Sequence, residues 1–136
     1  MNKDTVKKGE NINWIAAGAF ICGLYVLLGA FGAHGLKEHL KQADLNTYHT
    51  ALRYLSFHGI ALIAVNITAI VLSLKLRYVN YLFTAGILLF SGSLLLHSTK
   101  SLLGFDMDFF AMLAPIGGLS FVIAWIMLAI KLLRKK

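Results

Sequence analysis

The chain has 136 residues, of which 58% are apolar and only 14% are charged, and its formal net charge is +7. About 25% of the residues in a typical soluble domain are charged, so this chain cannot cover a water-exposed surface and a soluble globular protein is excluded. The apolar bias also excludes a disordered chain. A single cysteine, Cys22, excludes an intramolecular disulfide framework and a cysteine zinc site.

Charged residues divide the chain into four long uncharged segments. A helix rises 1.5 Å per residue, so about 20 apolar residues cross a bilayer, and each segment is long enough for one crossing only. Backbone groups cannot stay unpaired in lipid, so the spans should be helices. The sequence therefore predicts an all-α membrane protein with one domain, residues 1–136, in which four transmembrane helices form an antiparallel bundle. The predicted spans are about 13–35, 52–74, 78–99 and 109–131.

The positive charges predict the orientation of these spans. With four crossings, the N-terminus, the loop at 75–77 and the C-terminus share one side of the membrane. That side carries nine basic residues: Lys3, Lys7, Lys8, Lys75, Arg77, Lys131, Arg134, Lys135 and Lys136. The other side carries four: Lys37, Lys41, Arg53 and Lys100. The positive-inside rule therefore places both termini in the cytoplasm, and the basic charge is matched to anionic lipid headgroups rather than to nucleic acid.

The longest connection, residues 36–49, lies between the first two spans. Leu36 and Leu40 are four residues apart, which favours a short helix lying in the membrane interface. Asp44 is placed to cap a second helix that runs into the second span.

Polar side chains gather in the half of the membrane away from the termini. The candidate ligand or proton site consists of His34, Tyr54, His58 and His97, which come from the first three spans. Tyr54 and His58 share a helix face because they are four residues apart. Three interpretations stay open: structural hydrogen bonding, which is favoured, proton or ligand chemistry, and a zinc or copper site. No two of these histidines have the i, i+4 spacing of a helical metal site, so no metal ion is expected.

Small residues predict where helices pack closely in lipid. The residues assigned to helix packing are Gly29, Gly32, Gly35, Ser91, Gly92, Ser93, Pro115, Gly117 and Gly118. Pro115 also predicts a kink in the fourth span. Asn66, near the centre of the predicted second span, predicts a hydrogen bond between helices.

The sequence contains no recognisable catalytic motif. It has no GxSxG nucleophile elbow, no Walker loop, no HExxH and no dinucleotide fingerprint. All acidic residues lie outside the predicted spans, which argues against an exporter that exchanges protons through a buried carboxylate. We therefore expect no enzyme activity and no cofactor.

Four sequence boxes resemble those of a known family. They are GAFGAHG at 29–35, the pair Tyr54 and His58, FSGS at 90–93 and PIGG at 115–118. In this order they resemble the domain-of-unknown-function 423 family, small bacterial inner-membrane proteins related to the eukaryotic transmembrane protein 256. The resemblance covers about residues 13–130 and implies four membrane helices in a bacterial plasma membrane, without an established reaction, substrate or cofactor. Leu95 and Ala114 depart from the Tyr and Thr that are frequent in the family.

These observations favour a multi-pass protein of the bacterial plasma membrane with a non-catalytic role in interaction or membrane organisation. The alternative is a carrier or binding protein for a small molecule, a proton or a lipid, which would use the His/Tyr cluster. The expected partners are the lipid bilayer and either further copies of the chain or another membrane protein, without nucleic acid.

Overall fold

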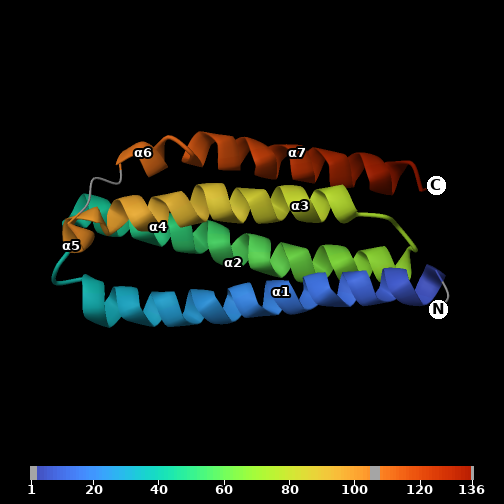
Figure 1. Cartoon of the computed structure of the whole chain (residues 1–136), viewed down its shortest axis with the longest axis horizontal. Coiled ribbons are helices and arrows are strands. Elements are labelled where there is room, and N and C mark those ends of the chain that lie inside the picture. Colours follow the sequence, from blue (N-terminus) through green and yellow to red (C-terminus); the bar gives the residue numbers. More distant parts are fainter. Residues whose placement is uncertain (1–2, 105–107, 136) are drawn as a thin grey trace.

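The computed structural model describes residues 3–104 and 108–135. Within these residues all regular structure is helical (Figure 1). The elements in chain order are α1 (Lys3–Phe31), η1 (Gly32–Leu36), α2 (Gln42–Val71), α3 (Arg77–Gly86), η2 (Ile87–Gly92), α4 (Ser93–Ser98), α5 (Lys100–Leu103), α6 (Asp108–Ala111) and α7 (Ala114–Leu133). The two η elements are single wide π-helical turns that continue the neighbouring α-helices.

Four of the resulting rods are long and apolar enough to cross a membrane, as the sequence predicts. They are Gly9–Leu36, Gln42–Val71, Arg77–Ser98 and Phe109–Leu133. Both chain ends lie at the same end of the bundle (Figure 1). This arrangement agrees with an even number of crossings, while the cytoplasmic placement of that end stays a prediction.

The connection between the first two spans is shorter than predicted. The predicted helix that runs into the second span is confirmed: α2 begins at Gln42, before the predicted membrane span at 52. Leu36–Leu40, however, does not form a separate interfacial helix. Lys41 is the N-cap residue of α2, and Asp44 lies in the first turn, where its carboxylate is favourable beside the positive end of the helix dipole. The prediction of an interfacial helix and of an Asp44 cap was therefore wrong. Leu45, Tyr48 and Leu52 are buried at helical spacing. Their packing explains why α2 extends to the end of the bundle.

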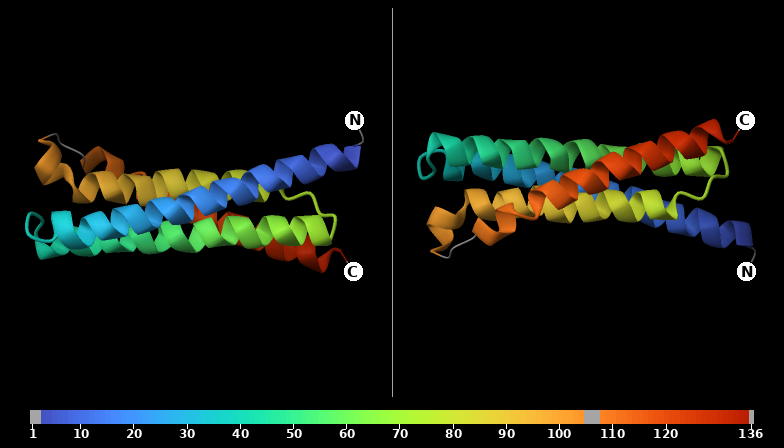
Figure 2. Two further views of the ribbon diagram at one scale, coloured as in Figure 1. Left: turned by 90° about the horizontal axis from the view of Figure 1, so that it is seen from below. Right: turned by 90° about the horizontal axis from the view of Figure 1, so that it is seen from above.

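The helices are arranged so that α1 and α7 lie on opposite faces of the inner pair, which consists of α2 and the α3–η2–α4 rod (Figures 1 and 2). Of the four spans, α2 is the most buried and α1 the least. Most of the surface of α1 is therefore left to face lipid. Helix α7, in contrast, packs along the α3–η2–α4 rod and reaches α2 through the side chains of Phe121 and Trp125.

Close backbone contact joins α1 to α2. A Cβ atom added at Gly18 would lie 2.7 Å from the carbonyl oxygen of Gly59, and one added at Gly59 would lie 2.8 Å from Cγ2 of Ile21. At the far end of α1, a Cβ atom on Gly32 would lie 2.6 Å from Cε1 of Tyr48. These contacts are the close approach that small residues permit between helices in lipid.

The second close contact joins η2 to α7. Gly117 is buried and lies directly against the backbone of Phe90, so any side chain there would collide with the main chain of η2. Gly118, the next residue, leaves room beside the Phe90 ring. Pro115 lies in the first turn of α7, after two turn residues that separate α7 from α6, so the fourth span is interrupted directly before the proline, as predicted.

The remaining predicted packing residues divide into two groups. Ser91 and Ser93 are buried in the α3–η2–α4 rod. Gly29 has no atom of a neighbouring element within 4 Å of its added Cβ, Gly35 meets the ring of Phe31 on its own helix, and Gly92 meets only its own rod. The GAFGAHG segment therefore packs through Gly32, while Gly29 does not contact another helix.

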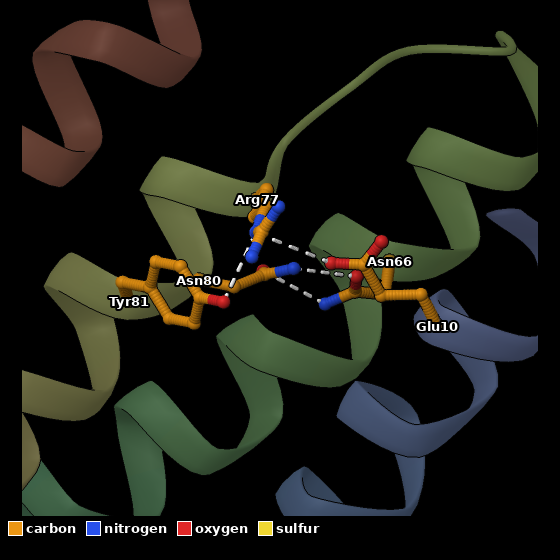
Figure 3. A network of polar contacts seen from close by, with 5 residues as sticks. All are labelled: Glu10, Asn66, Arg77, Asn80 and Tyr81. Carbon is orange, nitrogen blue, oxygen red and sulfur yellow. Dashed lines mark hydrogen bonds and ion pairs between the residues drawn. The ribbon is translucent and has the colours of Figure 1, made fainter.

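A polar network crosses the bundle near the loop that joins α2 to α3 (Figure 3). The buried amides of Asn66 and Asn80 bond to each other across the two helices, which confirms the predicted hydrogen bond of Asn66 between helices. Asn66 lies in the last two turns of α2 rather than at its centre, because α2 extends well before the predicted membrane span. Nearby, Arg77 donates to the hydroxyl of Tyr81 at 3.0 Å and lies 3.9 Å from a Glu10 carboxylate oxygen, at the surface.

Candidate ligand-binding groove

A cavity of about 640 Å³ lies between α2, η2 and α7. We call it the α2–α7 groove, and it is lined by Arg53, Tyr54, Phe57, His58, Phe90, Gly118, Phe121, Val122 and Trp125. The α2 residues form two adjacent pairs one turn apart, at 53–54 and 57–58. The α7 residues lie at positions 118, 121, 122 and 125. Each helix therefore presents one face to the groove. Both helices run in the same direction along the bundle (Figure 1). Arg53 and Gly118 therefore lie toward the end away from the chain termini, and Trp125 lies toward the termini.

His58 forms the buried floor of this groove, with 3% of its surface exposed. Its Nδ1 lies 2.9 Å from the carbonyl oxygen of Tyr54, and the indole Nε1–H of Trp125 donates to its Nε2 at 3.3 Å. An indole N–H can only donate, so Nε2 is the acceptor and Nδ1 carries the proton that it donates to the Tyr54 carbonyl. Both ring nitrogens of a neutral imidazole are thus engaged within the bundle.

Aromatic stacking fixes the His58 ring further. Its plane lies 7° from that of Phe121, and the two ring centroids are 3.5 Å apart. Trp125 in turn packs edge-on against Phe83, with centroids 5.0 Å apart. The floor of the groove is therefore a rigid layer of rings contributed by α2, α3 and α7.

The walls of the groove are apolar and partly exposed. The ring centroids of Tyr54 and Phe90 are 4.4 Å apart, and those of Phe57 and Trp125 are 5.9 Å apart. Phe57 and Val122 are more than half exposed although both are apolar, so the groove opens sideways on the surface that faces the bilayer. The groove therefore presents an apolar, ring-lined surface on the outside of the bundle.

Arg53 supplies the groove's charged group, at the end away from the termini. Its side chain is exposed, and one of its Nη atoms donates to Oγ1 of Thr50 at 3.2 Å. A guanidinium has five N–H donors, so most of them are left for a further acceptor. The groove thus combines a cation at one end with a ring-lined apolar channel.

The structure brings together two of the four residues of the predicted site. Tyr54 and His58 both line the groove, with their rings 5.9 Å apart. His34 lies exposed on η1, and His97 lies half-buried in the last turn of α4, and neither lines the groove. Among the described residues, no group of three or more His, Cys, Asp or Glu side chains is placed to hold a metal ion.

The partner of His58 was not anticipated from the sequence. The sequence groups His58 with His34 and His97 of other spans, but the structure places Trp125 of the fourth span beside it instead. Phe121 and Trp125 are four residues apart and continue the face that begins at Gly118, so their spacing predicts a shared face. The rotation of α7 that turns this face toward α2 is set by packing, above all by Gly117 against η2.

The chain is similar to a family of bacterial membrane proteins. The family model described as "Protein of unknown function (DUF423)" matches residues 28–118. The chain is 34% identical to a UPF0382 membrane protein of Staphylococcus saprophyticus and 36% identical to one of Bacillus subtilis, in each case covering 86% of this chain and 93% of the relative. It is 37% identical to a UPF0382 membrane protein of Haemophilus influenzae, covering 90% and 92%. No solved structure matches the chain.

Proposed function

The chain belongs to the DUF423 family, its bacterial relatives are named membrane proteins, and it has four helices that could cross a membrane; from this premise we propose that it is a non-catalytic protein that binds a phospholipid. In this proposal one acyl chain of the lipid occupies the α2–α7 groove and its phosphate contacts Arg53. The observation that carries the proposal is an aromatic groove of about 640 Å³ that opens sideways and has one cation at its end.

The size and the lining of the groove support an apolar occupant. Binding sites for small molecules are usually 300–1,000 Å³, largely apolar, and equipped with a few polar groups that fix orientation. Beyond Trp125, a second cavity of about 170 Å³ continues between the same two helices as far as Thr68 and Leu132. An extended chain therefore finds apolar surface along most of the seam between α2 and α7.

The position of Arg53 supports a phosphate at the end of the groove. A guanidinium pairs well with phosphate, because its N–H groups match two oxygens of the anion. Long basic side chains near the ends of membrane helices extend toward the headgroup region. A lipid with its phosphate at Arg53 would run along the rings of Tyr54 and Phe57 toward Trp125.

The state of His58 argues against the proton and enzyme alternatives. A general base or a proton relay needs a ring nitrogen that is accessible to the reacting group. Here Nδ1 donates to the Tyr54 carbonyl and Nε2 accepts from Trp125. These contacts favour a structural role for the imidazole and a binding role for the groove.

Fluorescence quenching tests this proposal. The chain has two tryptophans, so Trp14→Phe leaves Trp125, in the groove, as the single emitter. Phosphatidylcholine brominated in its acyl chain is added to the detergent-solubilised full chain, and quenching is expected to saturate at a low lipid fraction. Quenching that rises only in proportion to the lipid content would contradict a defined site.

A matched pair of variants separates the groove from ordinary lipid contact. Val122→Phe fills the groove from a residue that is 54% exposed, so it should abolish saturable quenching without disturbing the core. Leu119→Phe, at a residue of α7 that is 59% exposed and outside the groove, should leave it unchanged. Equal behaviour of the two variants would refute the proposed site.

A further inference from the structure

A second groove lies between α3 and α7 at the end of the bundle that carries the chain termini. We call it the α3–α7 groove; its volume is about 450 Å³, and Ile123, Ile126, Met127 and Ile130 form its apolar wall. Tyr78 lines it from α3, and Lys131 and Arg134 line its end. We propose that this groove is a binding site for one anionic phospholipid, with the acyl chain on the isoleucines and the headgroup phosphate held between Lys131 and Arg134.

Helical spacing places the cations directly after the apolar wall. Ile123, Ile126, Ile130 and Arg134 recur at intervals of three or four residues, so they follow one another along a single face of α7. Lys131 lies on the same face, next to Ile130. A lipid molecule has this same order of parts, an apolar chain and then a charged headgroup.

Among the described residues, no carboxylate is paired with the basic side chains of this groove. In the part of the chain that the structure describes, Glu10 is paired with Arg77, and neither Lys131 nor Arg134 takes part in an ion pair. Basic side chains between membrane helices attract anionic headgroups, and each Lys or Arg adds a similar contribution to the binding free energy. Two adjacent cations therefore favour a lipid with net negative charge over a zwitterionic one.

The apolar wall and the basic end together argue for a lipid rather than for other occupants. Free phosphate would gain nothing from the four apolar side chains next to the cations. A second copy of the chain, inserted with the same orientation, would bring its own Lys131 and Arg134 to the same depth, where like charges repel. This site is independent of the α2–α7 groove, because the two grooves share none of their lining residues.

The test measures how many phosphatidylglycerol and phosphatidylcholine molecules the intact chain retains, by native mass spectrometry after exchange into mild detergent. The wild type should retain phosphatidylglycerol in preference. The double variant Lys131→Gln/Arg134→Gln should bind it about 30-fold more weakly, since two cations are removed. Lys37→Gln/Lys41→Gln, which removes two exposed charges at the opposite end, should bind like the wild type.

Two further measurements decide between the occupants. Ile126→Trp fills the groove and keeps both cations, so it should also lose phosphatidylglycerol, while added inorganic phosphate should not displace the lipid from the wild type. Unchanged retention in the Lys131/Arg134 double variant or in Ile126→Trp would overturn the proposal. Displacement by inorganic phosphate would also overturn it, as would a change of oligomeric state in the double variant without any loss of lipid.

Discussion

Asn66 and Asn80 each donate a side-chain N–H to the other's carbonyl oxygen, and both hydrogen bonds are 2.9 Å long. Both residues are almost completely buried, and the amide of Asn66 donates in addition to the carbonyl of Leu62 at 2.8 Å. This reciprocal pair fixes α3 against α2 beside the loop that joins them (Figure 3). Without a hydrophobic driving force between helices in lipid, such polar pairs help to set which helix faces meet.

We expect Asn80→Leu to lower the free energy of unfolding by about 1–2 kcal/mol, because it leaves the Asn66 amide oxygen buried without its donor. The effect can be measured by unfolding the detergent-solubilised chain with denaturant. The double variant Asn66→Leu/Asn80→Leu should lose less than the sum of the two single variants, since the two residues act as a pair. Strictly additive losses would show that the pair is not coupled.

The contact between α1 and α2 gives a second prediction. Gly18→Ala should destabilise the chain by about 1–3 kcal/mol, because the new Cβ would lie 2.7 Å from a backbone oxygen that cannot move independently of α2. Gly23→Ala, on the same helix, meets no atom within 4 Å and should be neutral or slightly stabilising. Thermal unfolding of the two variants side by side provides the measurement. If both substitutions were equally harmless, α1 would not pack on α2 through this glycine.

A comparison of Gln and Leu at position 58 tests the role of His58. A glutamine amide can donate and accept, so His58→Gln should keep a partner for Trp125 and unfold within about 1 kcal/mol of the wild type. His58→Leu should cost about 1–3 kcal/mol, since the indole N–H loses its acceptor. The readout is the unfolding midpoint together with the yield of folded chain. A Leu variant as stable as the Gln variant would mean that the hydrogen bonds of His58 contribute nothing.

The four spans could be predicted because span length is a property of one segment at a time. Charged residues must leave the hydrocarbon region, and the gaps between them therefore mark the crossings. The same signal marks only the part of α2 that crosses the membrane and not the residue at which the helix begins. Lys41, Asp44 and Arg53 are excluded from the membrane centre but are compatible with a helix that projects beyond it, and the structure continues α2 through them from Gln42.

The site could be predicted only in part, for a related reason. Tyr54 and His58 share a face of one helix, and helical spacing is enough to pair them. The contact of His58 with Phe121 and Trp125 depends on how α7 is rotated against α2. That rotation follows from the close approach of Gly117 to the backbone of η2. Residue spacing within one helix cannot predict such a contact between two helices. His34 and His97 were grouped with this site because they were predicted at a similar depth in the membrane. Depth does not determine the direction in which a side chain points, and neither residue lines the groove.

Reporter fusions test the orientation, on which the membrane leaflet of each groove depends. With the nine-to-four division of Lys and Arg, a fluorescent protein fused to the C-terminus should fluoresce, because it folds in the cytoplasm, and a fused alkaline phosphatase should be inactive. The groove at Lys131 and Arg134 would then lie in the cytoplasmic leaflet, and Arg53 in the opposite leaflet. An active phosphatase at the C-terminus would reverse both assignments.

Occupation of the α2–α7 groove by a lipid chain can be tested with a photo-crosslinking amino acid placed at Val122 and, in a matched variant, at Leu119. Each variant is expressed in bacterial membranes, washed extensively with detergent to remove surrounding lipid, irradiated and analysed by mass spectrometry of the intact chain. We expect a phospholipid adduct at position 122 and little or none at position 119, because a lipid in the groove is retained and lipid on the outer surface is not. Equal adduct formation at the two positions, or none at position 122, would contradict it.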